Sequence, residues 1–441
     1  MGASSKLTPQ LLRGVECVYA TITLFALTQG PIYRLWSESA AYQQFIALPA
    51  VGQAHFSTFL MLQLPALVIW CRTVSITQFR EQRFVWLAGL LGWLALTVVW
   101  STFARHSISE YVALVFTTGF GLYLCHRLTT REFWSVIIAA MSIGLLWSLY
   151  SVTMLWDGAV DLQADYWIGI YFNRNSLAPV AAVSLVGLIG LLSATRLRQQ
   201  WSAYVLVGGC LGLTTLAAIV LWKADSQTSP LALAVGVAGL ILWRLFRWFA
   251  TALRLSSRIQ RLTMPLAVLI MTAAVFVTLY YAENVTSLSR ETTTFNIRRP
   301  LWNMSWSGFL LKPIHGWGWM AAWRTLHFFH QGEWWTIYPT EWSHSAYFDL
   351  LLGGGIPALV LFMGLVLVGA TRIGSLAVGE AAPRLLLSGF VLAAATQESF
   401  FIGSHFLWAL LIAALFAPDE SVPRRFESAR RETSGEATSR N

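Results

Sequence analysis

Long apolar segments recur along almost the whole chain, from about residue 14 to residue 417, and constrain its fold more than any other feature. A helix of about 20 mostly apolar residues is long enough to cross the hydrocarbon core of a bilayer. Charged residues make up only 12% of the sequence, whereas soluble globular domains contain about 25%. The chain is therefore predicted to be an all-α integral membrane protein.

About twelve transmembrane helices are predicted from these apolar segments. Their ranges are 14–30, 54–71, 84–101, 108–125, 133–155, 175–194, 202–222, 230–247, 263–282, 345–370, 385–398 and 400–417. The first segment is interpreted as a retained helix, because no clean small-residue cleavage site follows it.

These spans predict four parts of the chain. They are an N-terminal transmembrane bundle (1–282), one large, partly helical extracytoplasmic loop (283–343), a C-terminal group of transmembrane helices (344–420) and a disordered cytoplasmic tail (421–441).

The distribution of Lys and Arg predicts the orientation. If the N-terminus is cytoplasmic, most of the 30 Lys and Arg residues fall in inner segments, as the positive-inside rule expects. Both termini are then cytoplasmic, and topology explains the net charge of +9 better than nucleic-acid binding does. The basic residues left on the outer side are Arg34, Arg105, Arg174, Lys223, Arg290, Arg298, Arg299, Lys312 and Arg324.

The predicted outer loop is rich in Trp and His, whereas a flexible linker would be rich in Ser, Gly and Pro. It is expected to pack as short helices on the membrane surface. Its tryptophans, including Trp302, suit either anchoring at the bilayer interface or stacking on sugar rings. His327 and His330 have no acidic residues at a metal-ligand spacing, so no metal site is predicted.

Candidate functional residues occur at both ends of this loop. The adjacent guanidinium groups of Arg298 and Arg299 suit a phosphate or diphosphate, which they can bind through paired donors. Lipid head groups are the alternative partner. His344 lies where the chain re-enters the membrane, and a histidine there can act as a base near neutral pH. A simple polar helix cap is the alternative role.

Two further outer segments carry polar groups. Asn173, Arg174 and Asn175 open a predicted helix, and a helix N-terminus favours anions. Lys223 and Gln227 lie in the connection between two later spans, for which an ordinary capped turn is the alternative. Possible substrate contacts are Asn173, Asn175, Gln227, Trp302 and Tyr347.

Four segments of the chain together resemble the O-antigen ligase superfamily of bacterial membrane glycosyltransferases, which includes O-antigen and exopolysaccharide polymerases. Residues 342–359, with His344 and a Gly-rich helix start, are similar to the family's His-Asn-aromatic-Leu-Gly signature, with Ser345 in place of Asn. Residues 296–302 and 312–318 are similar to its Arg-x-x-x-Trp and Pro-x-x-Gly-aromatic-Gly segments, and 169–178 to its Gly…Asn-x-Leu-Ala segment.

The resemblance implies an inverting, metal-independent glycosyltransferase without a cofactor, in the bacterial cytoplasmic (inner) membrane. Its donor would be a glycan on undecaprenyl diphosphate, and its acceptor a hydroxyl of lipid A–core or of a growing polysaccharide. On this reading His344 is the base on the extracytoplasmic face, and Arg298, Arg299, Arg174 and Lys223 bind the diphosphate. Membrane lipids are expected partners, and nucleic acid is not.

Three alternatives remain open from the sequence. A polymerase of the same superfamily uses the same donor chemistry with another lipid-linked repeat as acceptor. A transporter of lipid-linked glycans fits the predicted spans loosely, although no internal repeat is visible and few ionisable residues lie at mid-helix. A non-catalytic assembly protein is the third alternative.

Overall fold

The structure is a computed structural model of the chain. It describes residues 9–31, 49–74, 76–162, 165–171, 173–195, 200–256, 259–260, 262–268, 270, 273, 294–329, 342–400 and 405–418. Most of the predicted span 263–282, residues 283–293 and 330–341 of the predicted loop, and the predicted tail 421–441 lie outside the described residues.

Eight of the described helices are long and apolar enough to cross a membrane. They are α1 (Pro9–Leu27), α4 (Pro49–Thr73), α5 (Gln82–Thr97, continued by the 3-10 turn η2, Val98–Trp100), α6 (Ala104–Arg127), α7 (Thr130–Thr153), α8 (Arg174–Ala194), α10 (Thr228–Ala252) and α14 (Ala346–Gly374). Each overlaps a predicted span. Apolar spans form helices because a helix pairs its own backbone N–H and C=O groups, which lipid cannot do. The chain is thus an all-α protein of the membrane type, and the count of twelve spans stays a prediction.

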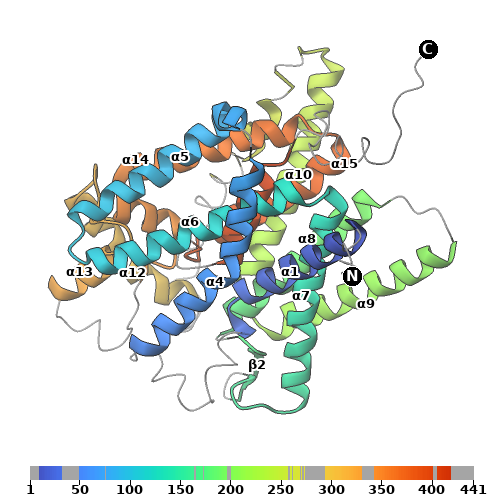
Figure 1. Ribbon diagram of the computed structural model, residues 1–441, viewed down its shortest axis with the longest axis horizontal. Helices are drawn as coiled ribbons and strands as arrows, with labels where there is room; N and C mark the ends of the chain where they lie inside the picture. The colour runs from blue at the N-terminus through green and yellow to red at the C-terminus, as the bar shows by residue number, and fades with distance from the viewer. Residues whose placement is uncertain are drawn as a thin grey trace, which may run out of the picture.

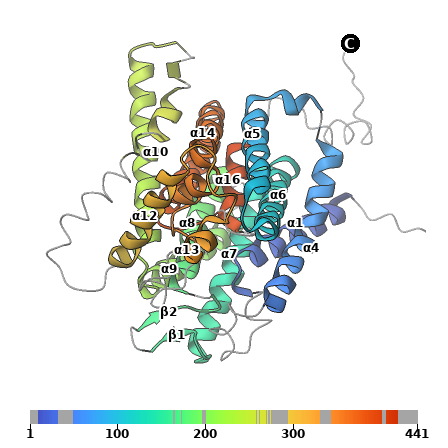
Figure 2. The ribbon, with the colours of Figure 1, turned by 90° about the vertical axis from the view of Figure 1, so that its left-hand side faces the viewer.

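The remaining elements are turns, two short strands and helices in which the apolar segment is shorter than these spans or less apolar. They are the 3-10 turn η1 (Ile76–Arg80), the strands β1 (Val160–Asp161) and β2 (Tyr166–Trp167), and the helices α9 (Gln200–Lys223), α12 (Thr294–Leu311), α13 (Ala322–Phe329), α15 (Val378–Ala394) and α16 (Phe406–Leu415). The two strands pair as a small antiparallel hairpin before α8. Residues 294–329 of the predicted loop form α12 and α13, in front of the long helices in Figure 2.

The long helices pack in neighbouring pairs around a buried centre. α5 runs along α14, α4 along α6, α7 along α8, and α10 along α15 (Figure 1). All residues of the short helix α16 are buried among them. Large apolar side chains such as Met61, Val99 and Trp222 remain exposed on the outside of the bundle, where lipid contact would remove them from water.

One end of the bundle is held by arginines around the C-terminal end of α16. Arg83 donates from Nη1 to the carbonyl oxygens of Leu415 (3.3 Å) and Ala417 (3.1 Å). Arg384 donates to a carbonyl of the same helix, and Arg372 donates to the oxygen of Ala417. These donors satisfy carbonyl groups that a helix end leaves without partners. The opposite end of α16 points toward the polar cluster described below.

The chain between α12 and α13 packs directly on the backbone of α14. The amide of Trp317 donates to the carbonyl oxygen of Leu352 (2.7 Å), and the amide of Gly318 donates to that of Gly353 (3.1 Å). A sheet-like contact of this kind requires backbones without bulky side chains between them. The glycines in residues 312–318 and 342–359 therefore allow the loop to bond to α14, the helix that follows His344.

Gly355 interrupts α14 with a positive φ of 67° and a ψ of −165°. A Cβ atom added at this position would lie 2.2 Å from the carbonyl oxygen of Ile314. Both the backbone conformation and the close approach demand glycine. The break lets the amide of Ile356 donate to the carbonyl oxygen of Pro313 (2.8 Å).

We predict that Gly355→Ala lowers the free energy of unfolding by roughly 1–3 kcal/mol or more, because alanine would be strained at this φ and would clash with Ile314. The midpoint of thermal unfolding in detergent, followed by size-exclusion chromatography, measures the loss. Gly208→Ala is the matched control, since a Cβ at Gly208 in α9 meets no atom within 4 Å. Equal midpoints for the two variants would contradict the assigned packing.

Candidate functional site

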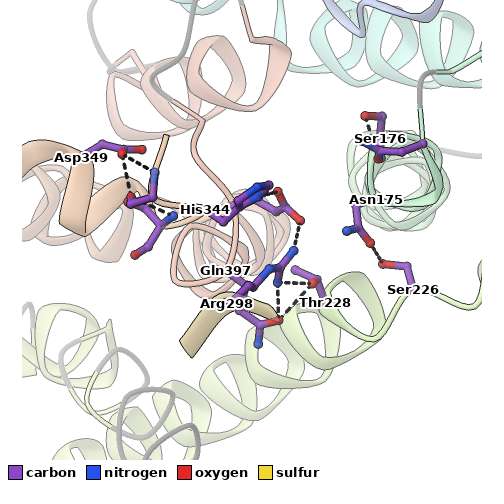
Figure 3. Close-up of polar contacts among 12 residues, drawn as sticks. Asn175, Ser176, Ser226, Thr228, Arg298, His344, Asp349 and Gln397 are labelled. Atoms are coloured by element: carbon purple, nitrogen blue, oxygen red, sulfur yellow. Dashed lines mark hydrogen bonds and ion pairs between the residues drawn. The ribbon is translucent and has the colours of Figure 1, made fainter. Parts of the chain in front are cut away.

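His344 lies just before the N-terminus of α14 in a left-handed backbone conformation, with a φ of 51°. Non-glycine residues adopt this conformation rarely, and such residues cluster at functional sites. The buried Asp349 holds the preceding residue, because it accepts hydrogen bonds from the amide (3.1 Å) and the hydroxyl (2.6 Å) of Ser343. The turn that presents His344 is thus fixed from inside α14 (Figure 3).

The N-terminus of α14 is also tied to residues 395–400, which connect α15 to α16. The amide of Ala346 donates to the carbonyl oxygens of Ala395 (2.9 Å) and Glu398 (3.2 Å). The predicted span 385–398 extends beyond α15, which ends at Ala394. The chain leaves the helix there, and this turn brings Gln397 and Glu398 to the site.

The carboxylate of Glu398 lies between His344 and Arg298. Its Oε1 atom accepts from Nη2 of Arg298 (2.5 Å), and its Oε2 atom faces Nδ1 of His344 at 3.7 Å. Arg298 is nearly fully buried, with 4% of its side chain exposed, whereas 31% of the His344 side chain is exposed. The ring of His344 is therefore the part of this cluster that faces the outside.

Arg298 makes two more contacts with side chains of its own chain. Its Nη1 atom donates to the hydroxyl of Thr228 (3.3 Å) and to Oε1 of Gln397 (3.1 Å). The Thr228 hydroxyl in turn donates to the same Gln397 oxygen (3.0 Å). Arg298 thus joins the start of α10, helix α12 and the connection 395–400, as Figure 3 shows.

Glu398 is held ionised by its neighbours. Burial by itself raises the pKa of the Glu398 carboxyl, but the charge of Arg298, with the nearby His344, outweighs burial and lowers that pKa below its usual range. A buried carboxylate needs such partners, because removal from water penalises its charged form. The carboxylate of Glu398 therefore presents a negative charge to the His344 ring, and Arg298 balances that charge from the other side.

Arg174 lies at the first position of α8. Its Nη1 atom donates to Oδ2 of Asp225 (3.0 Å), and its guanidinium carbon lies 4.7 Å from the ring centroid of Tyr166 in β2. The Asp225 side chain is 76% exposed. The small hairpin thus supplies an aromatic support for a cation whose carboxylate partner stands in solvent.

Lys223, the last residue of α9, has a similar environment. Its Nζ atom lies 3.5 Å from Oδ2 of Asp165, whose side chain is 85% exposed, and 5.3 Å from the ring centroid of Trp222. Asp165 and Asp225 both have positive φ angles, of 51° and 47°. Two partly exposed cations are therefore each paired with a carboxylate on a turn.

The predicted polar contacts around Arg174 mostly hold the local structure. Asn173 caps α8 by accepting from the amide of Ser176 (2.9 Å), and Asn175 accepts from the hydroxyl of Ser226 (2.9 Å). Gln227 is exposed and makes no side-chain cap for α10.

The connection between α9 and α10 brings Arg174 near Arg298. Asp225, which contacts Arg174, and Thr228, which contacts Arg298, are three positions apart in the sequence. Their α-carbons are therefore within about 11 Å of each other even in extended chain. The structure brings the predicted cations Arg174, Lys223 and Arg298 to the same end of the bundle as His344.

Three other predicted residues have different surroundings. Tyr347 is buried, and its hydroxyl donates to the carbonyl oxygen of Leu392 (3.0 Å), so it serves the packing of α14 on α15. Trp302 packs on the core, with its ring centroid 6.5 Å from that of Phe348. The side chain of Arg299 lies outside the described residues.

Gln397 and Glu398 belong to the cluster but are not among the residues predicted from the sequence. A charged residue at the edge of an apolar segment is a general sign of function, and Glu398 ends the predicted span 385–398. That signal could have identified it. Its pairing with Arg298, 100 residues earlier, has no local sequence pattern.

The fold and the cluster define a polytopic α-helical protein with a polar site at one end of its bundle. The model of the family described as O-antigen ligase matches residues 212–363. This match confirms the resemblance of the chain to the O-antigen ligase and polymerase superfamily. The matched segment includes Lys223, Arg298 and His344, whereas Arg174 precedes it and Glu398 follows it. A search of curated proteins finds no match.

We predict that Arg298→Leu lowers the free energy of unfolding by about 3–5 kcal/mol, because Glu398 would keep a buried charge without its main partner. The double variant Arg298→Leu/Glu398→Leu removes both charges and is expected to recover much of the loss. Thermal unfolding midpoints of both proteins in detergent provide the measurement. A double variant no more stable than Arg298→Leu alone would show that the pair is not the source of the effect.

Proposed function

We propose that the protein is a glycosyltransferase that moves a glycan from undecaprenyl diphosphate to a hydroxyl acceptor. The reaction takes place on the extracytoplasmic face of the bacterial cytoplasmic membrane. The observation that carries the proposal is the partly exposed His344 ring at the same end of the bundle as the cations Arg174 and Lys223. The family match over residues 212–363 supports this class of reaction.

His344 is the proposed base. The acceptor hydroxyl gives its proton to the ring, and its oxygen forms a bond to the anomeric carbon of the donor glycan. The bond from that carbon to the diphosphate oxygen breaks, and its electron pair leaves with undecaprenyl diphosphate. Attack opposite the leaving group inverts the anomeric centre. General base catalysis of this kind typically contributes about 10²–10⁴-fold.

Arg174 and Lys223 are the proposed ligands of the diphosphate. Stabilisation of the charge that develops on a leaving group is often the largest contribution to catalysis. Their present partners, Asp225 and Asp165, are exposed, and ion pairs in solvent contribute only about 0–1 kcal/mol. A diphosphate, with more charge and more acceptor oxygens, can replace these carboxylates at little cost.

Other predicted substrate contacts fit this arrangement to different degrees. The exposed Gln227, between Ser226 and Thr228, can reach the donor from the α9–α10 connection. Direct contacts of Arg298 and Arg299 with the diphosphate stay predictions, as does stacking of Trp302 on a sugar ring. Asn173 and Asn175 contribute by holding Arg174 in place through their bonds to Ser176 and Ser226.

Ligase and polymerase are the two forms of this proposal, and they differ in the acceptor. A ligase transfers the glycan to lipid A–core, whereas a polymerase transfers it to another lipid-linked repeat. Glycan analysis of a strain that lacks the protein distinguishes them. Accumulated long lipid-linked polymer identifies a ligase, and single lipid-linked repeats identify a polymerase.

We predict that His344→Ala abolishes glycan transfer while the amount of protein in the membrane stays unchanged, because the variant loses only the base. Transfer is measured by the glycan profile of complemented cells, and protein by immunoblot of the membrane fraction. His126→Ala, at the C-terminal end of α6, is the matched control and should retain transfer. Normal transfer by His344→Ala would refute the proposed role of this residue.

We predict that Arg174→Gln and Lys223→Gln each raise the donor KM about tenfold or more, since a hydrogen bond to a charged group contributes about 1.5–3 kcal/mol. Initial rates of the purified variants at varied donor concentration give this value. Arg105→Gln, in an exposed position near the start of α6, controls for the loss of one positive charge. A donor KM equal to that of the wild type in both variants would exclude them as diphosphate ligands.

A further inference from the structure

We propose that Glu398 is a positioning residue for His344, and that Arg298 holds Glu398 in that position. This inference rests on the proposed function, and it assigns a role to a residue outside the segment matched by the family model.

The two oxygens of Glu398 have separate partners. One accepts from Arg298, and the other faces Nδ1 of His344 at 3.7 Å. The Nδ1 atom is buried, although 31% of the His344 side chain is exposed. The exposed part of the ring therefore lies away from Nδ1, so substrate can approach Nε2.

This arrangement selects the form of the ring that a base requires. In a neutral imidazole one nitrogen carries the proton and the other accepts. A carboxylate facing Nδ1 favours the proton on that nitrogen, so Nε2 keeps the lone pair that takes the acceptor proton. The carboxylate also stabilises the positive ring that results. The separation of 3.7 Å suits an ion pair with the protonated ring, and catalytic contacts often become shorter when substrate binds.

Arg298 holds Glu398 from inside the bundle. It is nearly fully buried, and its Nη atoms donate to Thr228, Gln397 and Glu398. Turning toward a substrate would leave Glu398 buried without its main counter-charge, which is strongly unfavourable. Arg174 and Lys223 differ, because 26% and 30% of their side chains are exposed and their carboxylate partners can turn into water.

The backbone supports the same assignment. The connection that carries Glu398 is bonded to the N-terminus of α14 through Ala346, two residues after His344. Asp349 holds Ser343, directly before His344. The ring and the carboxylate are therefore mounted on segments that are joined to each other, which is the rigidity that a positioning contact needs.

Steady-state kinetics with a lipid-diphosphate glycan test the inference in four purified proteins. They are the wild type, Glu398→Gln, the double variant Arg298→Gln/Glu398→Gln, and Arg174→Gln. Glu398→Gln keeps the shape and the hydrogen-bonding capacity of the side chain but not its charge. The double variant removes Arg298 without leaving a buried charge behind. Glu81→Gln is the matched control, because Glu81 pairs with Arg83 at the other end of the bundle.

We expect Glu398→Gln to lower kcat about 10–100-fold, which is part of the roughly 10²–10⁴-fold that a base contributes. Its donor KM should equal that of the wild type. The double variant should show the same kcat as Glu398→Gln, and Glu81→Gln should match the wild type. Glu398→Asp is expected to recover part of kcat, since it restores the charge.

Each other result has a definite meaning. Unchanged kcat in Glu398→Gln overturns the positioning role. A double variant with a kcat well below that of Glu398→Gln overturns the role of Arg298 as the holder of Glu398, because Arg298 would then act on the reaction independently. A wild-type protein that binds the donor but transfers no glycan to any hydroxyl acceptor overturns the proposed function, and the inference with it.

Discussion

The carboxylate of Glu398, on a side chain that is only 16% exposed, is the group on which the rest of the site depends. An ionised carboxylate in this position requires a counter-charge, and Arg298 supplies it from α12. The same guanidinium holds Thr228 at the start of α10 and Gln397 beside the carboxylate itself. Helices that are far apart in the sequence are thereby fixed around one charge, and His344 is placed against it.

The glycines of α14 allow the loop backbone to contact this helix closely. The helix that follows His344 must also receive the backbone of residues 313–318, and it does so where Gly355 breaks its regular conformation. The loop is consequently held by backbone hydrogen bonds at one end of α14. At the other end of the bundle, arginines bind the last carbonyls of α16, so this short buried helix is fixed between two polar layers.

The sequence was sufficient for the membrane class, for the positions of the long apolar helices and for the grouping of His344, Arg174, Lys223 and Arg298 at one end. Apolar length and local motifs carry that information. They do not show which distant residues contact each other in the fold. Nothing local to Arg298 shows that it is buried against Glu398, and nothing local to Tyr347 shows that its hydroxyl bonds Leu392 in the core. Contacts between distant residues decide which cations remain accessible.

The proposed reaction breaks the bond between a glycan and a lipid diphosphate at this site. The most direct measurement is the amount of free undecaprenyl diphosphate released by the purified protein for each glycan bond formed. It uses a labelled lipid-linked glycan, an acceptor and a metal chelator. We expect one lipid diphosphate to be released for each glycan transferred. Movement of the intact lipid-linked glycan with no release of diphosphate would contradict it and would favour a transporter.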